Sequence, residues 1–464
     1  MMMRARNGRA SPATTRPNIG RRQTASPREV AVNVLRQWHE GQGRLDLLLD
    51  HALLRSPLTP RDRALATELV NGTCRWLGTI HWLLDRLFHR GLKSCPTTIL
   101  PILETGLYQL LALDRVPDYA AVDQAVQLAQ QTAGKNWAGV VNGVLRSFIR
   151  QRESIPWPSI EADPVKAIST RYSHPAWLVR RWLKRYGVEE TIQLCQANNS
   201  TPPVTIRVNR LRAEPQEILA SLGGDIDAVP SPYDENFIVV RSHQIELRRM
   251  DILREGKCSV QDVSAGLPAR LLAASPQSTV LDLCAAPGGK ATYVAELTGD
   301  QARIIAADIS KLRTRLTAEN CARLSLKRVH PVVADGKRPA VREVTHVLLD
   351  APCTGFGVLG KRADLRWQRR EGDIPMLVAL QRQLLNSAAS LLPVGGILVY
   401  ATCTIEPDEN EQVVQHFLDT HPGFALDHAA QFVPAELVDE AGYVRTSHHH
   451  GIDGSFAARL VRRS

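Results

Sequence analysis

The second half of the chain alternates between short apolar runs and helical segments, and this alternation limits the fold more than any other feature. The apolar runs are STVLDLC (278–284), ARIIAAD (302–308), VHPVVAD (329–335), THVLLDAPC (345–353) and GGILVYATC (395–403). Most of them are separated by helical segments such as KATYVAEL and LRTRLTAENCARL. Such an alternation predicts a Rossmann-like, mostly parallel, doubly wound sheet, in which ligands bind beyond the carboxyl ends of the strands.

The chain before this sheet divides into segments of different character. Residues 26–150 have helical periodicity throughout, which predicts an all-α domain. Residues 151–170 begin with a proline-containing stretch without periodicity and are interpreted as a linker. Residues 171–255 mix helical stretches with strand-like runs such as PPVTIRVN, which predicts a small α+β domain before the α/β domain of residues 256–464. The chain is therefore expected to be multidomain.

The positive net charge of +10 is concentrated at the N-terminus. Residues 1–28 hold seven arginines and no acidic residue, whereas the rest of the chain is nearly neutral. We interpret residues 1–25 as a disordered basic arm that tethers RNA or is simply solvated, with an organelle transit segment as the alternative. No apolar run approaches the roughly 18 residues that a membrane-spanning helix needs, so no membrane contact is expected.

The eight cysteines include no C-x-x-C pair, which argues against a zinc cluster and favours a reducing, cytoplasmic location. The segment SHHHG (447–451) is interpreted as a loop, because three adjacent histidines cannot all converge on one ion. We therefore expect no metal, and we expect a monomer.

Acidic residues end successive predicted strands, and a glycine turn follows the first strand. The acids are Asp282, Asp308, Asp335 and Asp350. Gly288 and Gly289 let the backbone approach a ligand closely, but their spacing matches neither the phosphate-binding loop nor G-x-G-x-x-G. This pattern predicts a nucleoside cofactor, with Asp308 accepting ribose hydroxyls and Asp335 near the adenine.

Two cysteines, Cys353 and Cys403, stand at the ends of two predicted strands. A cysteine that acts in covalent catalysis must be a thiolate, which a thiol of ordinary pKa rarely is at neutral pH. The residues alone do not decide which of the two is the nucleophile.

The motifs DLCAAPGGK, DAPCTG and YATCT, in that order, resemble those of the RNA 5-methylcytosine methyltransferases of the NOL1/NOP2/Sun family. GKCSVQDVSAGLP and GSFAARLVR resemble the first motif and the last strand of that family, and VPDYAAVDQAVQLAQ with VVNGVLRSF resembles a NusB-like RNA-binding domain. The combination is similar to bacterial 16S rRNA cytosine-C5 methyltransferases. The resemblance implies S-adenosylmethionine as the cofactor and RNA as the partner.

The resemblance also implies roles for particular residues. Cys403, in YATCT, would add to C6 of cytosine, Cys353 would assist release, and Asp350 would hold the base and touch the cofactor. The cofactor would lie against Asp308, Asp335, Asp350 and the turn Cys284, Ala285, Ala286, Pro287, Gly288, Gly289 and Lys290, where the thiol of Cys284 is expected to be inert.

The basic and aromatic loop VLGKRADLRWQRR (358–370) follows Cys353 and is expected to contact RNA. The residues concerned are Lys361, Arg362, Arg366 and Trp367. Arg362 and Ala363 replace the family's usual His-Pro, which affects the detail of substrate contacts. Two alternatives to an enzyme acting on 16S rRNA are the same chemistry on tRNA or another RNA, and a non-catalytic NusB-like assembly factor.

Overall fold

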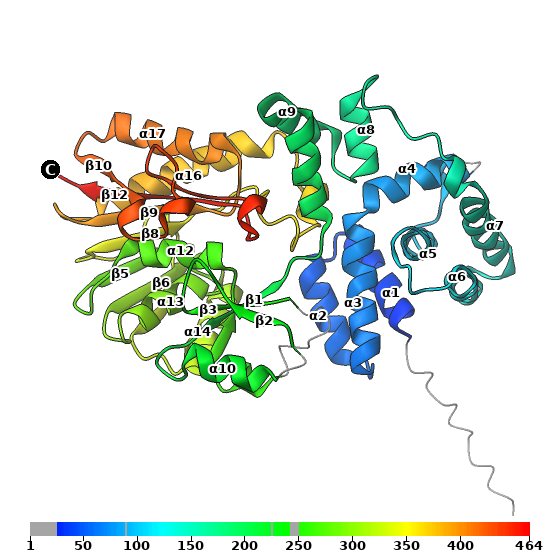
Figure 1. Cartoon of the computed structure of the whole chain (residues 1–464). Coiled ribbons are helices and arrows are strands. Elements are labelled where there is room, and N and C mark those ends of the chain that lie inside the picture. The colour runs from blue at the N-terminus through cyan, green and yellow to red at the C-terminus, as the bar shows by residue number, and fades with distance from the viewer. Residues whose placement is uncertain (1–25, 89–90, 224–225, 242–249) are drawn as a thin grey trace, which may run out of the picture.

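The computed structural model describes residues 26–88, 91–223, 226–241 and 250–464. The predicted basic arm, residues 1–25, lies outside the described residues. Figure 1 shows a helical domain at one side, a domain built on a large sheet at the other, and the helices α8 and α9 between them.

The N-terminal domain is helical throughout its described part. Ser26 caps the first helix by accepting a hydrogen bond from the Glu29 amide at 3.2 Å, and Pro27 occupies the first turn, where its missing N–H costs nothing. The central helix, α5, is buried around its whole circumference from Pro101 to Leu110. The helices are α1 (Pro27–His39), α2 (Leu45–Arg55), α3 (Pro60–Arg75), α4 (Leu77–Leu87), α5 (Leu100–Ala112), α6 (Asp118–Ala133) and α7 (Lys135–Gln151).

The segment expected to be a linker packs against this domain. Trp157 stacks on Trp82 with ring centroids 5.1 Å apart, and helix α8 (Pro164–Arg171) begins inside the segment, capped by Asp163. The following helix, α9 (Ala176–Asn199), is interrupted at Gly187, whose φ of 77° belongs to the left-handed region that favours glycine.

A small antiparallel sheet with the order β2-β3-β1-β4 follows. Its last strand, β4, pairs with β1, so this sheet continues past residue 256, where the sequence analysis places the start of the α/β domain. The elements are β1 (Val204–Val208), α10 (Pro215–Leu222), β2 (Ala228–Pro230), β3 (Phe237–Val240), α11 (Asp251–Arg254) and β4 (Cys258–Val260).

The large sheet has the order β10-β12-β9-β8-β5-β6-β7, with β11 paired to β12. The five strands from β5 to β9 are parallel, and the remaining ones are antiparallel to their neighbours. The strands are β5 (Thr279–Leu283), β6 (Arg303–Asp308), β7 (Val329–Val333), β8 (His346–Asp350), β9 (Ile397–Thr402), β10 (Phe424–Asp427), β11 (Val444–Thr446) and β12 (Ser455–Arg462). The predicted fold class is thus confirmed.

Helices cover both faces of the large sheet. One core contains side chains of α12 (Val263–Leu272), α13 (Gly289–Leu297) and α14 (Lys311–Leu324), and the opposite core contains side chains of α16 (Asp373–Ser390) and α17 (Glu411–Thr420). Alternate residues of a strand enter opposite cores: Val280 enters one and Leu281 the other. Among the described helices, none is both long and apolar enough to cross a membrane.

Candidate active site

The glycine turn after β5 lies at the point where the strand order reverses, between β5 and β8. Gly288 has a φ of 97°, and a Cβ there would lie 2.7 Å from the Thr317 side chain, so glycine is required. The Ala285 amide donates to the Ala307 carbonyl at 2.9 Å, which ties the turn to β6. The rigid turn leads into α13 through Gly289 and Lys290, as expected.

Asp308 supports this turn from the end of β6. Its carboxylate accepts the Ala286 amide at 3.2 Å and the Ser310 amide at 2.9 Å, and each oxygen retains a further lone pair for a ligand hydroxyl. The next residue, Ile309, is a large apolar side chain that is 70% exposed. Asp335 is also exposed, two residues past the end of β7, and its carboxylate accepts the Lys337 amide at 3.0 Å.

Asp282 is a buried carboxyl group whose two oxygens make no hydrogen bond of ordinary geometry among the described residues, and the nearby Ala291 amide opposes the rise of its pKa only in part. Burial, and then the nearby Asp350, raise the pKa of Asp282 well above its ordinary value. A buried polar group without a partner is costly, so this carboxyl group fits a site that a polar ligand completes. Together with the apolar Ile309 and the acceptor Asp308, these groups fit a nucleoside cofactor with an uncharged ring and hydroxyls.

Cys284 adopts a φ of 62°, inside the same turn. Burial raises the pKa of its thiol to about 12, with Asp282 adding to the effect. The thiol is therefore protonated at neutral pH and is a poor nucleophile.

The structure brings Cys353 and Cys403 together, with their sulfur atoms 3.3 Å apart. Two further contacts join the loops that carry them: the Thr354 and Thr404 hydroxyls are 2.7 Å apart, and the buried Glu409 carboxylate accepts the Thr354 amide at 2.9 Å. Glu409, which the sequence analysis did not single out, therefore fixes the two loops relative to each other.

The two sulfur atoms have different environments. The hydrogen bond with Cys353 lowers the pKa of Cys403, against burial and the Asp350 carboxylate, which raise it, and the Lys290 ammonium lowers it further. The same hydrogen bond, and then burial, raise the pKa of Cys353. Cys353 is buried, whereas Cys403 is half-buried. Both differences favour Cys403 as the thiolate.

Lys290 links the cofactor turn to Asp350. Its ammonium lies 2.6 Å from an Asp350 carboxylate oxygen, and its side chain is only 14% exposed. Burial lowers the pKa of Lys290, but the Asp350 carboxylate outweighs burial, so the amine remains charged. The pair places a cation and a hydrogen-bonding carboxylate beside the cysteines.

Replacing Lys290 by methionine is expected to raise the pKa of Cys403 by about one unit or more, because the variant loses a nearby cation and leaves the Asp350 charge uncompensated. Both changes disfavour the thiolate. The pH dependence of alkylation at Cys403, followed by mass spectrometry, should shift to higher pH. The exposed Lys311→Met serves as the control and should leave the profile unchanged; an unchanged profile in Lys290→Met would contradict the role of the lysine.

The loop 358–370 lies between the domains, and this corrects the expectation for Arg366. That side chain is fully buried and donates to the Asn199 amide oxygen at 2.8 Å and to the Ser173 and Asn198 carbonyls, both at 3.1 Å. A buried guanidinium with these acceptors has no surface for RNA. The Trp367 indole likewise donates to the Cys74 carbonyl at 2.8 Å, so it packs against the helical domain.

Lys361 and Arg362 keep partial exposure. Lys361 pairs with Asp262 and, at 2.9 Å, with Asp453, and Arg362 lies 3.0 Å from the Asp364 carboxylate. Burial, reinforced by Asp262, raises the pKa of Asp453 to about 6 in spite of Lys361. Asp453 is not among the residues predicted from the sequence, although it directly precedes the last-strand motif.

The α9 helix fixes the loop after Cys403 from the other side. Arg181 lies 2.7 Å from the Glu406 carboxylate, which also accepts the Trp182 indole at 3.1 Å. A cavity of about 360 Å³ lies alongside, lined by α9, by the Gly357 and Thr404 loops and by residues 445–455. It adjoins the cysteine loops directly.

Three parts of the chain match known families. Residues 25–150 match the NusB family, residues 174–245 match the ferredoxin-like domain of RsmF/B-like methyltransferases, and residues 269–461 match the family described as 16S rRNA methyltransferase RsmB/F. The probable ribosomal RNA small subunit methyltransferase B of Bacillus subtilis is 32% identical, over 94% of this chain and 99% of that protein. The chain belongs to the RsmB/F family of methyltransferases.

Other members of the RsmB/F family agree with this assignment. The ribosomal RNA small subunit methyltransferase B of Sodalis glossinidius is 37% identical over 89% of this chain and 92% of that protein. Among solved structures, PH0851 is 26% identical, with a TM-score of 0.79 over 94% of this chain and 99% of that one. A methyltransferase homologue from Pyrococcus horikoshii is also 26% identical and covers 65% of this chain and 99% of that one, with a TM-score of 0.56. The expected NusB-like and methyltransferase domains are thereby confirmed.

Proposed function

We propose that this protein transfers a methyl group from S-adenosylmethionine to C5 of a cytosine in 16S rRNA through a covalent cysteine adduct. The observation that carries the proposal is the Cys353–Cys403 pair, 3.3 Å apart beside Lys290 and Asp350. The names of the relatives, which refer to the small ribosomal subunit, support 16S rRNA as the substrate.

In the proposed mechanism Cys403 is the nucleophile. Its thiolate bonds to C6 of a cytosine that is unpaired or flipped out, and the electron pair of the C5–C6 double bond moves toward C5, which becomes nucleophilic. Asp350, held by Lys290, hydrogen-bonds the edge of the base and stabilises the adduct. The C5 atom then forms a bond to the methyl group that S-adenosylmethionine, when bound, would supply from its sulfonium, with S-adenosylhomocysteine as the leaving group.

Release then regenerates the enzyme. The C5 proton is lost to a base, the electron pair of the C5–H bond restores the C5–C6 double bond, and the Cys403 sulfur departs as a thiolate. Cys353, whose sulfur lies 3.3 Å from that of Cys403, assists this elimination. The cofactor is proposed to lie against the turn 284–290. Asp308 would accept hydrogen bonds from the ribose hydroxyls, and Ile309 and Asp335 would lie near the adenine. A polar group of the cofactor would form the hydrogen bond that Asp282 lacks.

Bisulfite sequencing tests this proposal, because C5-methylated cytosine resists deamination. Wild-type protein, incubated with unmodified small-subunit rRNA and S-adenosylmethionine, should create a resistant cytosine. Asp308→Ala should weaken cofactor binding by at least about tenfold, a loss of 1.4 kcal/mol, whereas Asp419→Ala, which removes an exposed carboxylate on α17, should not change it. A resistant cytosine in tRNA instead would assign the same chemistry to another RNA, and no methyl transfer to any RNA would favour an assembly factor.

A further inference from the structure

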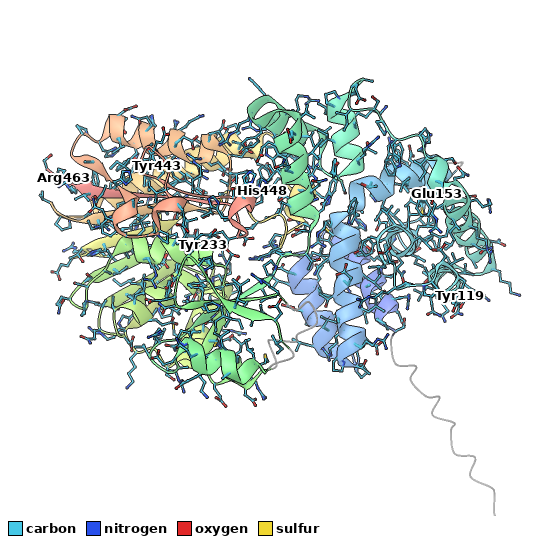
Figure 2. All side chains as sticks on the ribbon, viewed as in Figure 1. Tyr119, Glu153, Tyr233, Tyr443, His448 and Arg463 are labelled. Carbon is cyan, nitrogen blue, oxygen red and sulfur yellow. The ribbon has the colours of Figure 1, made fainter. Side chains whose placement is uncertain are left out.

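The SHHHG loop (447–451) faces a residue that lies far from it in the sequence. His448 and His449 belong to a short 3-10 turn (His448–His450), and Glu190 extends toward them from α9. Figure 2 shows His448 on the C-terminal segment next to α9. Glu190 lies more than 250 residues before the histidines in the sequence, so only the fold shows that two histidines and one carboxylate converge.

The distances among the three side chains suit a metal ion. The Glu190 carboxylate oxygen lies 3.6 Å from His448 Nε2 and 2.7 Å from His449 Nε2, and one ligand atom from each residue falls within 4.8 Å of the others. Tetrahedral Zn²⁺ with ligand atoms at about 2.1 Å from the ion holds those atoms about 3.4 Å from one another, which lies between these two distances. Side-chain rotations that bring all three ligand atoms to this spacing would complete the geometry.

His448 is also incompletely satisfied. Neither of its ring nitrogens has a hydrogen-bond partner among the described residues, although both are inaccessible to solvent. An imidazole in this position lacks the polar partner that buried nitrogens normally have.

We propose that Glu190, His448 and His449 form a binding site for a divalent transition-metal ion of the Zn²⁺ type. Two imidazoles and one carboxylate are a ligand set that Zn²⁺ accepts, with water or another ligand in the fourth position. The site lies apart from the proposed methyl-transfer residues and does not depend on the proposed function. It joins α9 to the loop before Asp453.

The bound ion would link two walls of the cavity next to Cys403, namely α9 and the 447–451 loop. The three ligands line the 360 Å³ cavity, together with Asp453 and the Thr404 loop. The exposed His449 donates a hydrogen bond to Glu190 across the gap between the 447–451 loop and α9, and water screens this contact. A bound ion restricts the separation of these two walls.

Titration of the metal-free, untagged full-length protein with Co²⁺ tests the site, because Co²⁺ bound by nitrogen and oxygen ligands absorbs visible light. Wild type should develop this absorption at one equivalent, and Zn²⁺ should displace it. Glu190→Gln, His448→Asn and His449→Gln should each weaken binding by at least about tenfold, since even changes around a metal site cost 10–100-fold. His416→Gln, an exposed histidine on α17, is the matched control and should bind as wild type does.

The result does not rest on one variant or on activity. His449 is 54% exposed, so His449→Gln should fold normally even if His448→Asn does not, and circular dichroism checks both. Zn²⁺ should raise the melting temperature of wild type and not that of His449→Gln. The proposal is overturned if wild type takes up no Co²⁺, or if the three ligand variants bind it as tightly as wild type does.

Discussion

Cys403→Ala is expected to reduce methyl transfer by about 10⁴-fold or more and to abolish the covalent RNA adduct. The alanine removes the half-buried sulfur whose pKa is lowered by its hydrogen bond with Cys353 and by Lys290. The neighbouring Cys353 cannot replace it efficiently, because that thiol is buried and burial raises its pKa even when its hydrogen bond with Cys403 is gone. Transfer of a labelled methyl group to small-subunit rRNA measures the loss.

Unlike Cys403→Ala, which should form no adduct, Cys353→Ala is expected to show RNA–protein adduct on a denaturing gel. This variant retains the Cys403 nucleophile and forms the adduct, but it lacks the group that assists elimination, so RNA–protein adduct should accumulate while turnover falls. The control is Cys95→Ala, a half-buried cysteine of the helical domain that should behave as wild type. If adduct instead accumulates in Cys403→Ala and disappears in Cys353→Ala, the nucleophile is Cys353 and the two roles must be exchanged.

The positions of both cysteines could be predicted because they depend on local sequence. The run THVLLDAPC forms β8 as far as Asp350, and GGILVYATC forms β9 as far as Thr402, so each cysteine follows a buried parallel strand. Adjacent parallel strands end at the same edge of the sheet, which brings the two loops together. The glycine turn was equally predictable, because its requirement for a positive φ is local.

The features that escaped prediction depend on contacts between distant segments. Arg366 lies among basic and aromatic residues, a composition typical of RNA binding, yet α9 and the helical domain bury it. The composition of a loop shows which side chains it carries. Only tertiary packing decides whether those side chains are exposed to solvent or buried against another domain. The same reason explains why Glu190 could not be assigned to the histidine loop from the sequence.

Arg207→Met is expected to destabilise the protein by about 3–5 kcal/mol, because it leaves a buried charge without its partner. Arg207, on β1, is fully buried and lies 2.8 Å from the Glu296 carboxylate on α13, which is only 2% exposed. It also donates to the Gly289 carbonyl at 2.7 Å, so the small domain supports the cofactor turn. The shift of the urea midpoint relative to wild type measures the loss, and Arg303→Met, at an exposed arginine on β6, should shift it little.

The pH dependence of this loss identifies its cause. Burial raises the pKa of Glu296 above its ordinary value even with Arg207 present, and removing the arginine raises it further. A carboxyl group whose pKa is higher in the folded state than in the unfolded chain favours folding when it is protonated. The deficit of Arg207→Met should therefore be largest above the folded-state pKa of Glu296 and shrink as the pH falls through it. Adding Glu296→Gln should recover much of the stability at neutral pH; a deficit that is independent of pH and unchanged in the double variant would instead show that lost packing, rather than the unpaired carboxylate, destabilises the protein.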